Sequence, residues 1–161
     1  RVKSEFTATE LKERRQTRIN KASGHNVRTF VAGEWTLEYD LAHSGLTQEV
    51  WQAAVLALAD ENIQVGKVTK EDAIGAREAE FLALAALELE AKASHVYALF
   101  ETEGASKAIG AQYLSELLEH AVESGGMGVD ELRSKLPSYV LDAIAYVTAP
   151  IPVTAAPEEQ G

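Results

Sequence analysis

The sequence predicts a mainly α-helical fold with a small α/β part of one or two short strands. Three observations predict it. Apolar residues recur at helical spacing from Thr47 almost to the end of the chain. Alanine and leucine are concentrated between residues 73 and 100, where they favour helices that pack closely. Only residues 27–31 are a β-type run, and Gly33 follows them as a breaker.

Composition places the chain among globular proteins. Its 161 residues make one domain or a piece of a larger one, and the first residue, Arg1, is not methionine, so we expect a piece. No run approaches the ~18 apolar residues of a membrane span, and no signal peptide is visible. The chain has no cysteine, which excludes disulfides and thiolate metal sites. We expect a protein of the reducing cytoplasm.

The net charge of −10 is unevenly distributed. Residues 1–21 hold seven Lys or Arg and three Glu, whereas residues 22–161 hold eight basic and twenty-two acidic residues. Affinity for nucleic acid depends on positive side chains that neutralise phosphates. If the chain meets nucleic acid, then metal ions, the basic N-terminal part or further chain must supply that charge.

The first two segments are an arm and a corner. Residues 1–21 form a basic helical arm, with Ser4, Thr7 and Thr9 as candidate caps. We expect a solvated helix, and contact with DNA is the alternative. Residues 22–46 form the strand and the corner after it, where Thr36 caps a helix whose apolar side faces inward.

Helices occupy most of the remaining chain. Residues 47–103 form a helical region, in which a buried helix over 50–59 is followed by a polar connection over 60–72. A long helical stretch over 73–100 then gives a hairpin or small bundle.

The last part of the chain, residues 104–149, also reads as helical. An amphipathic helix begins at Lys107, a short one covers 129–136, and Pro137 opens another over 138–147. Residues 150–161 are a proline-containing tail that we expect to have no fixed fold.

Three carboxylates surround the corner and are the candidate metal ligands. Glu34, Glu38 and Asp40 offer the oxygen atoms that hard cations such as magnesium prefer. The alternative is that acids in a first helical turn only favour the helix dipole. A helix places positions 34 and 38 on one face and turns position 40 away. Glu38 is therefore the first candidate, Asp40 the second and Glu34 the third.

Lys107 is the candidate cation of the site. It stands where a loop leads into a helix and could meet charge that develops on a phosphoryl group, although a solvated lysine is the alternative. Other chemistries lack their motifs: no HExxH spacing, Walker loop, nucleophile elbow or dinucleotide fingerprint is present.

Residues 26–46, 104–118 and 137–147 together resemble the C-terminal region of OLD-family (overcoming lysogenization defect) nucleases, which join an ABC-type ATPase to a Toprim nuclease domain. The specific segment is Thr36-Leu37-Glu38-Tyr39-Asp40-Leu41, and support comes from Ser106-Lys107-Ala108 and from Leu136-Pro137-Ser138-Tyr139-Val140. The resemblance implies a DNA endonuclease in which carboxylates hold two Mg²⁺ or Mn²⁺ ions. It implies Glu38 as a metal ligand, directly or through water, Asp40 as an assisting ligand and Lys107 as a stabiliser of the transition state.

The resemblance covers only part of such a nuclease. Residues 47–103 are similar to the helical insertion of the family, and residues 104–149 to the last Toprim helices. The upstream glutamate and the Asp-x-Asp pair of a Toprim site do not occur before residue 27. The expected partners are DNA, the first half of the Toprim domain, the ATP-binding N-terminal ATPase and a second copy in a homodimer. We expect this chain alone to bind metal weakly and to cleave nothing.

A non-catalytic helical interaction or oligomerisation module is the alternative. In that interpretation the helices over 73–100 pack against a partner, and the acidic residues are a solvated face.

Overall fold

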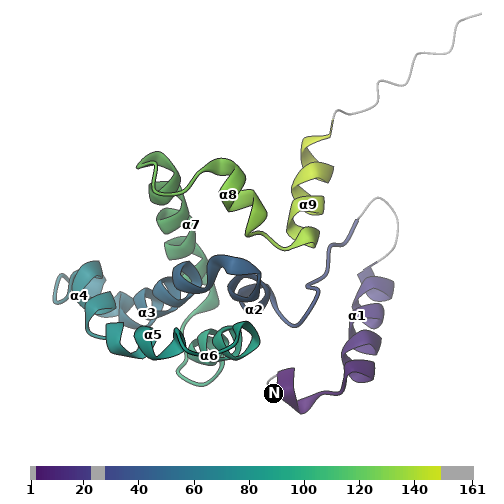
Figure 1. Ribbon diagram of the computed structural model, residues 1–161, viewed down its shortest axis with the longest axis horizontal. Coiled ribbons are helices and arrows are strands. Elements are labelled where there is room, and N and C mark those ends of the chain that lie inside the picture. Colours follow the sequence, from purple (N-terminus) through teal and green to yellow (C-terminus); the bar gives the residue numbers. More distant parts are fainter. Residues whose placement is uncertain (1–2, 23–27, 150–161) are drawn as a thin grey trace, which may run out of the picture.

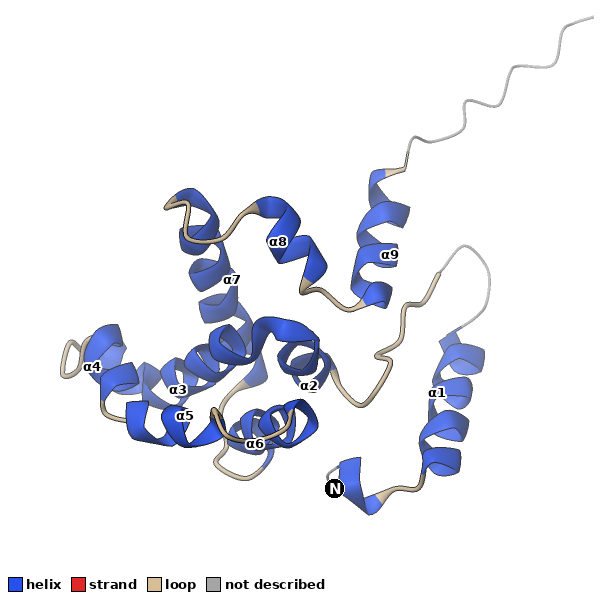
Figure 2. Ribbon diagram, in the orientation of Figure 1, coloured by secondary structure: helices blue, strands red, loops and turns tan. Residues whose placement is uncertain are grey.

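The computed structural model describes residues 3–22 and 28–149, without the side chains of Ser4 and Ala22. These residues form helices joined by short loops, and no strand occurs among them (Figure 2). The predicted mainly α-helical fold is confirmed. The predicted tail over 150–161 lies outside the described residues.

The strand predicted over 27–31 is wrong for its described part. Residues 28–32 have no regular secondary structure, and residue 27 lies outside the described residues. A strand needs a neighbouring strand to form its backbone hydrogen bonds, and no described segment pairs with residues 28–31 in this way. The side chains meet a helix instead: the rings of Phe30 and Tyr146 lie 5.8 Å apart, and the Arg28 guanidinium is 5.2 Å from each.

The N-terminal arm is a short 3₁₀ turn, η1 (Lys3–Glu5), followed by helix α1 (Ala8–Ala22). Of the predicted caps, Thr7 acts, whereas the side chain of Ser4 lies outside the described part of the chain. The Thr7 hydroxyl accepts from the Glu10 amide, while the Glu10 carboxylate accepts from the Thr7 amide. Phe6 and Leu11 pack against the core, and most other side chains of the arm are exposed. The predicted helix is confirmed over 8–22, whereas solvation of the helix, as against contact with DNA, stays a prediction.

The corner leads directly into the core. Thr36 caps α2 (Leu37–Leu41) as predicted, because its hydroxyl accepts from the Tyr39 amide. The chain then continues through the wide turn η2 (Ala42–Leu46), where Gly45 has a φ of 126° that favours glycine. The Ser44 hydroxyl donates to the Lys135 carbonyl and so ties this turn to a distant part of the chain.

Helix α3 (Thr47–Gln64) is the centre of the molecule and packs against α6 (Leu89–Glu101) and α7 (Lys107–Glu123) (Figure 1). It is longer than the predicted helix over 50–59, so part of the predicted polar connection is helical. Trp35 and Trp51 are buried in the core, as are the apolar residues that α3 turns inward. The predicted buried helix is thus confirmed, with different ends.

The predicted long helical stretch over 73–100 is interrupted. It contains the second half of α4 (Lys70–Gly75), all of α5 (Glu78–Leu84) and the greater part of α6. Helix α5 buries no residue, whereas α6 buries Ala93, Val96, Tyr97, Leu99 and Phe100. The turns between these helices allow α6 to bring its apolar face onto α3, which a single straight helix could not do.

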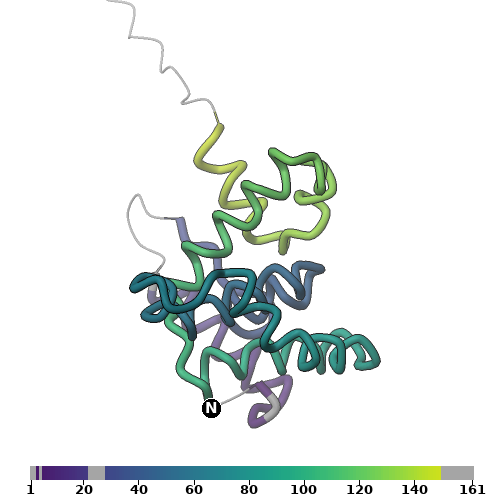
Figure 3. Tube along the Cα trace, turned by 90° about the vertical axis from the view of Figure 1, so that its left-hand side faces the viewer, coloured from purple at the N-terminus to yellow at the C-terminus, as the bar shows by residue number. Residues whose placement is uncertain are grey.

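The C-terminal helices are α8 (Val129–Ser134) and α9 (Ser138–Thr148), and Pro137 stands just before α9 as predicted. Figures 1 and 3 both show α8 and α9 beyond the layer formed by α3 to α6. Within the described residues, no helix combines the length and apolar character that crossing a membrane requires.

Candidate functional site

Glu38 and Lys107 form an ion pair. The Lys107 Nζ lies 3.1 Å from a Glu38 carboxylate oxygen and 5.1 Å from the centre of the Tyr97 ring. Glu38 lies in the first turn of α2, and Lys107 begins α7, where the Ser106 hydroxyl caps the helix. The side chain of Glu38 is 20% exposed and that of Lys107 is 46% exposed. The two residues that the sequence singled out independently therefore share one site that solvent can reach.

Asp40 has a different environment. It is the one buried charged residue in the described part of the chain, with 4% of its surface exposed. Its carboxylate accepts from the backbone amides of Gly33 at 2.7 Å, Glu34 at 3.2 Å and Trp35 at 2.9 Å. These bonds turn the corner and place α2 against it. Backbone donors already occupy both carboxylate oxygens of Asp40. Metal ligation by Asp40 stays a prediction.

Glu34 is engaged by the arm. The Lys3 Nζ donates to Glu34 at 3.0 Å, to Glu90 at 3.1 Å and to the Tyr39 hydroxyl at 3.3 Å. Burial lowers the pKa of the Lys3 ammonium, but these three hydrogen bonds outweigh burial and raise the pKa above its ordinary value. Glu34 thus holds the arm against the corner, and its place as a metal ligand stays a prediction.

Two tyrosines belong to the site: Tyr97, which the sequence did not single out, and Tyr139, which entered only as part of the supporting segment over 136–140. Burial, followed by the negative charges of Asp40 and Glu38, raises the pKa of the Tyr139 hydroxyl. Burial also raises the pKa of Tyr97, whose hydroxyl donates to Glu101. Both phenols therefore stay neutral at physiological pH. Pro137 marks the start of the helix that carries Tyr139, but no spacing pattern connects either tyrosine with Glu38.

The carboxylates of the site do not form a metal centre by themselves. Across residues 3–22 and 28–149, no group of three or more His, Asp or Glu side chains is arranged to hold a metal ion. Glu34 and Glu38 each face a lysine, and Asp40 faces backbone amides. A divalent ion generally needs six or more oxygen ligands, including water. This set is therefore at most part of such a site.

Comparisons with protein-family models, with curated proteins and with solved structures find no match to this chain. The geometry around Glu38 and Lys107 therefore carries the functional argument.

Proposed function

We propose that this chain is the C-terminal part of a Toprim-type, metal-dependent DNA endonuclease of the OLD kind. What supports the proposal is the meeting of Glu38 and Lys107 at 3.1 Å, although 69 positions separate them in the sequence. The Tyr97 ring lies beside Lys107, and the Tyr139 phenol, which burial keeps neutral, feels the negative charge of Glu38. An exposed lysine held beside a carboxylate and an aromatic ring suits a site that contacts phosphate.

The two residues have separate roles in this proposal. The Lys107 ammonium contacts a non-bridging phosphate oxygen and stabilises negative charge as it develops there. Glu38 keeps that ammonium oriented and offers a carboxylate at the same point. Asp40 is a positioning residue, because it holds the corner from which α2 begins.

The metal ions of this proposal, Mg²⁺ or Mn²⁺, need ligands in addition to the described carboxylates. The first half of a Toprim domain would supply them as an upstream glutamate and an Asp-x-Asp pair. ATP would be bound only by an N-terminal ATPase of the parent protein. The chain alone is accordingly inactive and binds metal weakly.

Nicking of supercoiled plasmid DNA by the complete parent protein, with Mg²⁺ or Mn²⁺, tests the proposal. Glu38→Gln and Lys107→Gln should each lower the nicking rate by about a hundredfold or more, which corresponds to the loss of one electrostatic contact to the transition state. The matched control is the ion pair between Lys70 and Glu116, which also involves α7. Removal of that pair should leave the nicking rate unchanged.

Unchanged nicking in the Glu38 and Lys107 variants would refute the assignment. Metal-dependent nicking by the 161-residue chain alone would refute the division of the site between two parts of a parent protein. Circular dichroism of each variant separates a loss of chemistry from a loss of fold.

Exposed apolar side chains favour a second candidate, a helical interaction module. Leu82 on α5 is 63% exposed and Val147 on α9 is 76% exposed, and Ile144 and Tyr146 on α9 are also exposed. Such side chains occur where partners bind. Sedimentation at high concentration tests the module as a self-associating one, and a strictly monomeric chain would contradict that form of it.

A further inference from the structure

Helix α1 is basic although the chain as a whole is acidic. Between residues 8 and 22 it carries five basic residues and two glutamates, while the net charge of the protein is −10. Arg14, Arg15 and Arg18 are spaced so that they share one side of the helix, and all three are exposed. Among the described residues none of the three makes an ion pair. Their charges are therefore available to a ligand.

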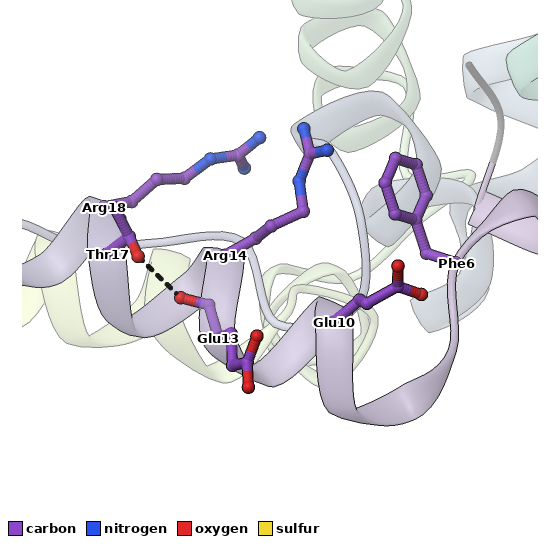
Figure 4. A pocket seen from close by; sticks show the side chains of 6 residues that line it. All are labelled: Phe6, Glu10, Glu13, Arg14, Thr17 and Arg18. Carbon is purple, nitrogen blue, oxygen red and sulfur yellow. Dashed lines mark hydrogen bonds between the residues drawn. The ribbon is translucent and has the colours of Figure 1, made fainter.

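Arg14 and Arg18 line a groove of about 490 Å³ together with Phe6, Glu10, Glu13 and Thr17. Figure 4 shows the side chains of Arg14 and Arg18 extending side by side, while the Glu13 carboxylate points the other way. Glu10 is engaged in capping, since its carboxylate accepts from the Thr7 amide and hydroxyl. The groove thus carries two arginines and two glutamates, and positive charge prevails in the adjoining hollow, which Arg14, Arg15 and Arg18 line with Glu34 as its one acid.

Arg14 is held in place by aromatic rings. Its guanidinium lies 4.4 Å from the centre of the Phe6 ring and 5.6 Å from that of Trp35. Such stacking orients a guanidinium and leaves its N–H groups free to donate. An oriented guanidinium suits phosphate, which it can bind through two parallel hydrogen bonds.

The groove shares Arg14 and Arg18 with a smaller hollow at the corner of the candidate site. Arg14, Arg15 and Arg18 line one hollow together with Gly33 and Glu34. Asp40 holds the backbone amides of those same two corner residues, and Glu38 lies in the helical turn that follows the corner. A DNA strand that passes along the arginines would therefore reach the corner that precedes the helical turn of Glu38.

We propose that Arg14, Arg15 and Arg18 form the surface that binds the phosphate backbone of DNA and leads it to the Glu38 and Lys107 pair. The charge distribution argues for this occupant, since the rest of the body carries twenty-two acidic and eight basic residues and repels DNA elsewhere. The identification of DNA as the ligand rests on the proposed function. The arginine surface is separate from the site of Glu38 and Lys107.

Fluorescence anisotropy of a labelled 20-base-pair duplex tests the surface, at ~50 mM salt with EDTA so that neither cleavage nor metal contributes. The triple variant Arg14→Gln, Arg15→Gln, Arg18→Gln should bind at least about tenfold more weakly. Its slope of log affinity against log salt should be smaller by about 2 to 3, since each lost phosphate contact removes about 0.9. In the double variant that keeps Arg14, the slope should decrease by about two thirds of the decrease expected for the triple variant.

The matched control removes the same charge elsewhere. Lys12, Lys67 and Arg133 are exposed, and none of them lines the groove. Changing all three to glutamine should lower the affinity less than threefold. Equal weakening in the two triple variants would overturn the inference, because net charge alone would then account for the binding. Absence of binding by the unmodified chain would overturn it as well.

Further measurements distinguish DNA from an acidic protein as the ligand of this surface. They also separate a failure of the DNA-binding surface from a failure of the proposed nuclease site. If poly-L-glutamate competes as effectively as DNA, or if the arginine variant loses self-association rather than DNA affinity, the surface binds acidic protein and the inference is wrong. If the anisotropy test fails while Glu38→Gln abolishes nicking, only the assigned surface is wrong. If nicking is unaffected while the arginine effect is observed, only the proposed chemistry is wrong.

Discussion

Replacement of Asp40 by alanine should destabilise the fold more than the loss of any exposed carboxylate. The Asp40 carboxylate is buried and accepts from three backbone amides, those of Gly33, Glu34 and Trp35. Alanine removes all three acceptor contacts and leaves the donors in place. The corner would then have no group that fixes it against α2.

The exposure of the three donors sets the magnitude. Trp35 is buried, so its amide stays unsatisfied in the variant, at a cost of about 2 kcal/mol. Water can reach the amides of the exposed Gly33 and Glu34, so the loss of each of these hydrogen bonds costs about 0.5–1 kcal/mol. Asp40→Ala should therefore lower the free energy of unfolding by about 3–4 kcal/mol. Asp40→Asn keeps one acceptor oxygen and should cost about half as much.

Equilibrium unfolding in urea measures this loss, with tryptophan fluorescence as the signal, because Trp35 lies at the corner and Trp51 in the core. The denaturant dependence should be unchanged, so that the shift of the midpoint reports stability alone. The control is Asp142→Ala, since Asp142 is exposed on α9, and it should change stability by no more than about 0.5 kcal/mol. A loss below about 1 kcal/mol in Asp40→Ala would refute the structural role of Asp40.

Two further predictions concern the packing and titration of α7. A Cβ atom at Gly110 would lie 2.9 Å from Cε1 of Phe100, so Gly110→Ala should lower the free energy of unfolding by about 1–3 kcal/mol. The control Gly75→Ala has open space around it and should be neutral or stabilising in the same assay; equal effects would contradict the packing argument. Burial and the Asp60 carboxylate raise the pKa of Tyr113 to about 12. The unfolded chain loses this proton near pH 10, so the contribution to stability is complete below pH 10 and is lost as pH rises toward 12. Tyr113→Phe should lose less stability than the unmodified protein between pH 8 and 11, and parallel losses would contradict this.

Local rules predicted the helix ends that depend on neighbouring residues. The capping of α2 by Thr36 and of α1 by Thr7 follows from side-chain chemistry within three residues. The buried face of α3 follows from its dense apolar pattern. The break between α5 and α6 was missed because residues 76–88 contain no proline or glycine, whereas Gly75 immediately precedes the break between α4 and α5.

The candidate site was predicted only in part. Glu38 and Lys107 were each found from their positions at the start of a helix, and the fold brings them together. The burial of Asp40 could not be read from the sequence, since it depends on the path of the backbone through Gly33 and Trp35. The strand expected over 27–31 fails in its described part because pairing needs a second strand, which a local pattern does not supply.

Exchange of the two charges tests the central claim most directly. The variant with Glu38→Lys and Lys107→Glu keeps an ion pair between the same helices, and such an exposed pair contributes at most about 1 kcal/mol to stability. If Glu38 and Lys107 belong to a nuclease site, the exchanged complete protein should fold with nearly unchanged stability and still fail to nick plasmid DNA with Mg²⁺ or Mn²⁺. If the exchanged protein nicks DNA at the rate of the unmodified protein, the pair only joins two helices. That result would contradict the claim that Glu38 and Lys107 belong to a nuclease site.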